Sequence, residues 1–162
     1  MVHTKPMRQH LLLSVWILVV AVGGCAIARP AWPAGYREAI CAATAHLRAA
    51  ADAVAEAAAD IEAADGERVA IAAAGMERES DDAQGAIDRA PGWEPGAGLR
   101  LELTSAAVAF GRAAAEFRIG ARQGDGPAFD RALALAQSAD ASLGRADLEA
   151  ERLRTAIGWQ PC

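Results

Sequence analysis

The chain has 162 residues, of which 53% are apolar, 23% charged and only 5% aromatic, and about a quarter are alanine. This length and apolar content exclude a disulfide-dense miniprotein and a disordered chain, and 3 cysteines with 3 histidines are too few for a multihaem protein. The net charge of −5 argues against a nucleic-acid partner, which would require a basic surface.

The first segment, residues 1–24, is interpreted as an export signal peptide. Lys5 and Arg8 precede an apolar run from Leu11 to Val22, and the sequence Val22-Gly23-Gly24-Cys25 ends the segment. These last four residues resemble the lipobox of bacterial lipoproteins, in which an aliphatic residue and two small residues precede a cysteine. The resemblance implies that Cys25 is lipidated after cleavage and that residues 25–33 form a tether to the membrane.

Two alternative interpretations of this segment stay open. Ala26-Ile27-Ala28 fits ordinary signal peptidase, which would release a soluble secreted protein beginning at Arg29. The run from Leu11 to Ala28 is also long enough to remain as an uncleaved anchor. In all three interpretations the rest of the chain lies outside the cytoplasm, either membrane-anchored in the cell envelope or secreted.

Four helices are predicted in the remaining chain, over residues 34–64, 67–90, 98–122 and 127–157. Turn signals at Asp65-Gly66, Pro91-Gly92 and Gly124 separate them, and Pro127 is a favoured first residue for the last one. No stretch has the period of two that is typical of a strand. The sequence therefore predicts one all-α domain over residues 34–162.

Each helix has an apolar seam at alternating spacings of four and three, with large residues and alanines along it. The seam residues of the first and second helices are Tyr36, Ile40, Ala43, Leu47, Ala50, Val54, Ala57, Ile61 and Ala64, then Val69, Ala73, Met76, Ser80, Ala83, Ile87 and Ala90. Those of the third and fourth are Leu99, Leu103, Ala106, Phe110, Ala113 and Phe117, then Phe129, Ala132, Ala136, Ala139, Leu143, Ala146, Ala150, Leu153 and Ile157. Because short loops make neighbouring helices antiparallel, we expect an alanine-rich, up-down-up-down antiparallel four-helix bundle.

In this topology the two ends of the domain meet at one end of the bundle. Cys41 and Cys162 lie there, and in an oxidising compartment they are expected to form a disulfide, the alternative being two buried free thiols. Trp32, Trp93 and Trp159 fall at the same end, which we name the aromatic pole. We expect these indoles to cap the core; contact with lipid headgroups and a ligand cleft are the alternatives.

Cofactor and catalytic sites find little support in the sequence. His46 is the only histidine after the first segment, and neither Glu-x-x-His nor Cys-x-x-Cys-His occurs. A haem held by His46 and Met76 is a weak alternative, since both could lie at one level of the bundle. Asp140 and Asp147 flank the last seam, where a neighbouring arginine is their expected partner. We predict no catalytic residue, no metal and no cofactor.

The sequence names no substrate, so the functional expectation is broad. We expect an exported, lipid-anchored and non-enzymatic module that binds or scaffolds another component of the cell envelope. Its expected partners are the membrane, through the lipid anchor or the N-terminal segment, and an envelope protein. The alternatives are a small-molecule or haem carrier that uses the bundle interior and a soluble secreted helical protein.

Overall fold

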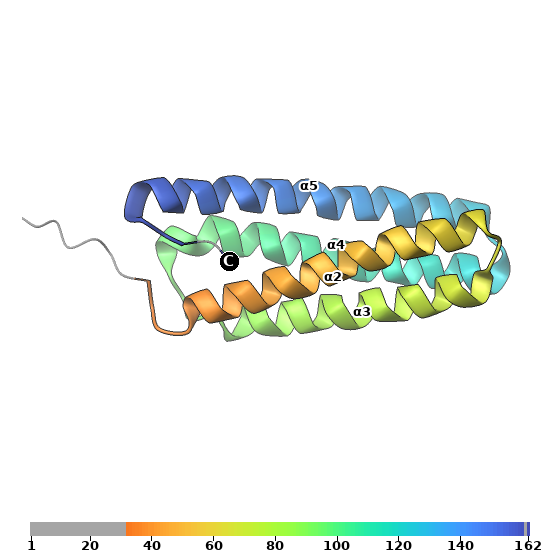
Figure 1. Ribbon diagram of the computed structural model, residues 1–162, viewed down its shortest axis with the longest axis horizontal. Coiled ribbons are helices and arrows are strands. Elements are labelled where there is room, and N and C mark those ends of the chain that lie inside the picture. Colours follow the sequence, from red (N-terminus) through yellow and green to blue (C-terminus); the bar gives the residue numbers. More distant parts are fainter. Residues whose placement is uncertain (1–31, 161) are drawn as a thin grey trace, which may run out of the picture. The chain divides into compact units, whose positions relative to one another are not determined.

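Four long helices form almost all of the part of the chain that the computed structural model describes, residues 32–160 and Cys162. The elements are α2 (Tyr36–Glu62), α3 (Gly66–Arg89), the short 3-10 helix η1 (Glu94–Gly96), α4 (Ala97–Gln123) and α5 (Gly126–Ile157). Successive helices run antiparallel (Figure 1), and these described residues contain no strand, which confirms the predicted all-α four-helix bundle. The predicted signal peptide, Cys25 and most of the tether lie outside the described residues.

The helices begin and end within two residues of the predicted bounds, because the turn signals act as expected. The carboxylate of Asp65 accepts a hydrogen bond of 3.1 Å from the backbone N–H of Arg68 and caps the start of α3. Gly124 and Gly158 cap the ends of α4 and α5, and their φ angles of 65° and 74° suit a residue without a side chain. None of the described helices combines the length and the apolar content needed to cross a membrane.

The core follows the predicted seams most closely in α3 and α4, where every seam residue is buried. Large side chains such as Leu103, Phe110 and Phe117 fill the layers, and alanines between them let the helix axes approach. Burial of each such large side chain contributes roughly 1.5–3 kcal/mol to the free energy of unfolding. The compact unit begins at Trp32, two residues before the predicted start of the domain.

One flank of the bundle is more open than the others. Helix α2 packs along α3, α3 along α4 and α4 along α5, whereas α2 and α5 touch at few positions. Six predicted seam residues on these two helices are only half-buried, and Ala64, which follows α2, is exposed; the six are Val54, Ile61, Phe129, Leu143, Ala150 and Ile157. The first and last helices thus leave a strip of apolar surface between them.

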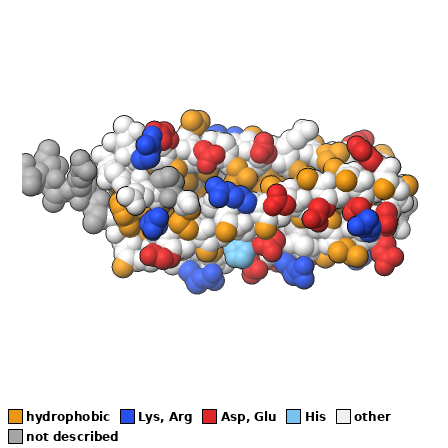
Figure 2. Space-filling view, viewed as in Figure 1, with side chains coloured by type: hydrophobic (Ala, Val, Ile, Leu, Met, Phe, Trp, Pro, Cys, Tyr) orange, Lys and Arg blue, Asp and Glu red, His pale blue; other side chains and the backbone are white. Residues whose placement is uncertain are grey.

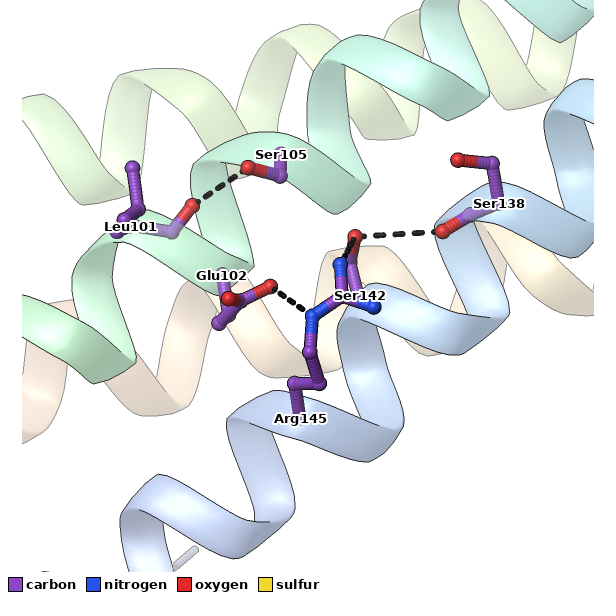
Figure 3. Close-up of polar contacts among 6 residues, drawn as sticks. All are labelled: Leu101, Glu102, Ser105, Ser138, Ser142 and Arg145. Carbon is purple, nitrogen blue, oxygen red and sulfur yellow. Dashed lines mark hydrogen bonds and ion pairs between the residues drawn. The ribbon is translucent and has the colours of Figure 1, made fainter.

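Polar contacts cross the closed flanks. Figure 3 shows Arg145 of α5, whose Nε donates to Glu102 of α4 and whose Nη2 donates to the hydroxyl of Ser142, both at 2.9 Å. Between α3 and α4, the two Nη atoms of Arg118 donate to the two carboxylate oxygens of Glu77. Pairs with exposed partners contribute less than about 1 kcal/mol each, so they adjust helix positions more than they stabilise the fold.

Candidate binding site between α2 and α5

An apolar hollow of about 350 Å³ lies between α2 and α5. We name it the α2–α5 groove, and its lining residues are Ala51, Val54, Ala55, Ala58, Phe110, Leu133, Ala136, Gln137 and Asp140. Phe110 reaches it from α4, the helix that lies behind α2 and α5 in Figure 1. The volume falls in the lower part of the range typical of small-molecule sites, which are mostly apolar with a few polar groups.

The groove exists because small side chains face each other across helices that stand apart. Alanines make up most of the α2 wall, and Ala136 contributes to the α5 wall. The segment after α5 crosses towards α2 at the aromatic pole (Figure 1). Trp159 of this segment is only 1% exposed and lines a small hollow together with Ile40 of α2 and Leu143 of α5.

This second, smaller hollow has a volume of about 80 Å³ and lies between α2 and α5 nearer the aromatic pole. Arg48 of α2 and Asp147 of α5 line it, together with Trp159 and Cys162. The face that has α2 in front carries apolar atoms between scattered acidic and basic side chains (Figure 2). A ligand in the groove would therefore meet an apolar floor and a polar rim.

Asp140 is the only ionisable residue that lines the larger hollow, and its side chain is exposed. The expected arginine partner is absent: within the described residues, neither Asp140 nor Asp147 forms an ion pair. A lone carboxylate beside an apolar surface favours a molecule that joins a hydrocarbon part to a cationic group.

The aromatic pole brings the predicted indoles together and adds Tyr36. The ring centroids of Trp32 and Trp159 are 5.1 Å apart, and those of Trp93 and Trp159 are 5.9 Å apart. Tyr36 packs edge-on against Trp93 with a centroid distance of 4.9 Å, and its hydroxyl donates to the carbonyl of Gly96 at 2.9 Å. Because Trp159 is buried and the other two indoles are half-buried, the cluster caps the core.

The predicted pair Cys41–Cys162 is bonded, with Cα atoms 5.3 Å apart. The bond ties the last residue of the chain to α2, and Arg37 strengthens this link by donating from Nε to the carbonyl of Gln160 at 3.2 Å. The two contacts hold the C-terminal segment across the end of the α2–α5 flank.

The two residues of the haem alternative have separate surroundings. Nδ1 of His46 lies 2.7 Å from Oε2 of Glu79 on the surface between α2 and α3. Met76 is fully buried in the core, and neither residue lines the groove. No cluster of three or more His, Cys, Asp or Glu side chains suited to a metal ion occurs in the described part of the chain.

The groove itself was not predicted from the sequence, although several of its residues were. Val54, Phe110 and Ala136 were assigned to seams, where they were expected to be covered. Leu133 was not assigned to any seam, because it falls beside the four-three spacing of the last helix. The sequence signal that could have revealed the groove is the two runs of alanines at positions 49–51 and 57–59 of α2, which forms one wall of the groove.

Comparison with known proteins adds no family to this description. No family model, no curated protein and no solved structure matches the chain.

Proposed function

We propose that this protein is an exported, membrane-tethered binding module that holds a small amphipathic molecule in the α2–α5 groove. The observation that carries the proposal is the apolar hollow of about 350 Å³, which has Phe110 and Leu133 in its lining and a lone carboxylate, Asp140, beside them. The hydrocarbon part of the ligand would occupy the hollow and a cationic group would lie near Asp140. The protein would act by binding and not by catalysis.

Two features support the location outside the cytoplasm. The first is the lipobox-like sequence that ends at Cys25, and the second is the bonded pair Cys41–Cys162, since disulfides persist in oxidising compartments. Mass spectrometry of the native protein tests the tether. An acylated N-terminal Cys25 is the expected result, and a mature chain that begins at Arg29 would overturn it.

Displacement of a neutral fluorescent probe tests the groove. The full-length protein is loaded with N-phenyl-1-naphthylamine, and dodecylamine and dodecanoate are compared as competitors. We expect dodecylamine to compete better, because Asp140 attracts its ammonium group and repels the carboxylate. The substitution Asp140→Asn should remove this difference while leaving the probe bound.

A second variant separates the groove from unspecific binding. Ala58→Leu places a larger side chain in the hollow and should abolish most of the probe signal, whereas Ala141→Leu adds the same side chain at an exposed position of α5 outside the groove. Any detergent in the sample takes up the probe equally with both variants. The difference in probe fluorescence between the two variants therefore reports binding in the groove. Equal probe binding by the two variants would overturn the proposal.

A further inference from the structure

The outward face of α4 carries most of the exposed large apolar side chains in the described part of the chain. Leu101, Val108 and Ile119 are 63%, 44% and 38% exposed. The other exposed large apolar residues in the described part of the chain are Ile71 and Leu148. The three lie directly opposite the buried seam of the same helix, which runs through Leu103 and Phe110. Helix α4 is thus apolar on two faces, one towards the core and one towards solvent.

The outward face repeats the spacing of a helix–helix contact. Its residues follow one another at alternating intervals of four and three: Leu101, Ser105, Val108, Arg112, Ala115, Ile119 and Arg122. This is the spacing by which one helix packs along another. The hydroxyl of Ser105 donates to the carbonyl of Leu101 at 2.9 Å (Figure 3), so its hydrogen is already used within α4. We name these seven residues the α4 outer seam.

The charges on this seam are all positive. Arg112 and Arg122 are exposed, and neither takes part in an ion pair with another described residue. Helix α4 as a whole has four arginines against two glutamates, whereas acidic residues outnumber arginines in α2, α3 and α5. An apolar seam with unpaired cations calls for a partner with apolar and acidic side chains at matching positions.

We propose that the α4 outer seam binds an acidic amphipathic helix of a partner protein. The distance from Leu101 to Ile119 is about 27 Å along the helix axis, so the bound helix would extend over five turns. A second copy of this chain fits less well, because pairing through the same face in register places Arg112 of one copy beside Arg112 of the other. An anionic membrane also fits less well, because the helices on either side of α4 are net acidic. This inference does not depend on the α2–α5 groove.

A designed peptide tests the proposal on the full-length protein in nanodiscs of zwitterionic lipid. The peptide is an amphipathic helix with leucines facing the apolar positions and glutamates facing Arg112 and Arg122; a control peptide has lysines in place of these glutamates. Fluorescence anisotropy should show that the acidic peptide binds about tenfold more tightly than the basic one. The double variant Arg112→Glu, Arg122→Glu should reverse this preference.

Variants of the apolar positions complete the test. Val108→Ser should weaken binding of the acidic peptide several-fold, whereas Leu148→Ser, at an exposed leucine of α5, should leave it unchanged. Circular dichroism verifies that every variant keeps its helical content. Equal affinity for the two peptides, or an effect of Leu148→Ser as large as that of Val108→Ser, would overturn the proposal.

Two further outcomes would assign the seam to another occupant and so also overturn the proposal. The first is a dimer in sedimentation that Val108→Ser dissociates. The second is a slowing of hydrogen exchange at residues 101–122 that occurs in anionic nanodiscs but does not occur when the acidic peptide is added.

Discussion

At the aromatic pole, four aromatic rings and a disulfide surround the two ends of the described chain, whereas at the opposite end two short turns at residues 63–65 and 124–125 join the helices. We name this second end the loop pole. Its turns need only local devices, such as the carboxylate of Asp65 that caps α3 and the left-handed Gly124 that ends α4. No loop joins the first helix to the last, so at the aromatic pole the buried rings and the Cys41–Cys162 disulfide hold these two helices together.

The largest expected effect comes from removal of that cross-link. Replacing both cysteines, Cys41→Ser and Cys162→Ser, frees a loop closed over 121 residues and should lower the free energy of unfolding by roughly 3–5 kcal/mol. Urea unfolding followed by tryptophan fluorescence measures the change. Reduction of the wild-type protein should produce the same loss. A double variant as stable as the oxidised wild type would show that the packing of Trp159 alone holds the C-terminal segment.

A smaller effect is expected from crowding of the aromatic pole. A methyl group on Gly96 would overlap the hydroxyl of Tyr36 and the ring of Trp93, so Gly96→Ala should cost about 1–3 kcal/mol in urea unfolding. Gly126→Ala is the matched change at the loop pole, where the added methyl meets nothing within 4 Å. We expect that control to change stability by less than about 0.5 kcal/mol. Equal effects of the two substitutions would mean that the aromatic pole is no more tightly packed than the loop pole.

The features that could be predicted from the sequence are those set by local chemistry and by periodicity. Turn residues located all four helices, and the seams of α3 and α4 are buried throughout. The pairing of Cys41 with Cys162 followed from topology, because an up-down-up-down bundle brings both to one end. In each case neighbouring residues or the direction of the helices decide the outcome.

The open flank could not be predicted in this way, because it depends on the distance between two helices that are far apart in the sequence. Val54 and Leu143 have seam spacing like Phe110, but they are half-buried, since α2 and α5 touch at few positions. Periodicity marks which face of a helix is apolar, and it does not give the distance to the helix opposite. The candidate site is therefore visible only in the structure, and only three of its nine lining residues, Val54, Phe110 and Ala136, belong to the predicted seams.

The ionisation of the Tyr36 phenol reports on the packing of the aromatic pole. The change in stability expected from this ionisation is the smallest of the predicted effects and is confined to alkaline pH. Burial raises the pKa of its phenol, while the nearby charge of Arg100 opposes the shift. A raised pKa means that the folded state retains the proton more firmly than the unfolded state, in which tyrosine ionises near pH 10. The stabilisation is therefore complete below about pH 10 and is lost as the pH rises through the pKa of the folded state.

Tyr36 is the only tyrosine and Lys5 the only lysine, so few other side chains ionise in this range. Urea unfolding at pH 8 and pH 11, with phenolate absorbance as a second measurement, should show stability falling as the phenol ionises. Tyr36→Phe should be less stable at pH 8 by about 1 kcal/mol, because the carbonyl of Gly96 loses its donor, and its stability should vary less with pH. If the wild type and Tyr36→Phe lost stability equally between these pH values, the alkaline effect would not originate at the aromatic pole. A change confined to the wild type would instead locate the titrating group in the ring cluster that joins the first helix to the last.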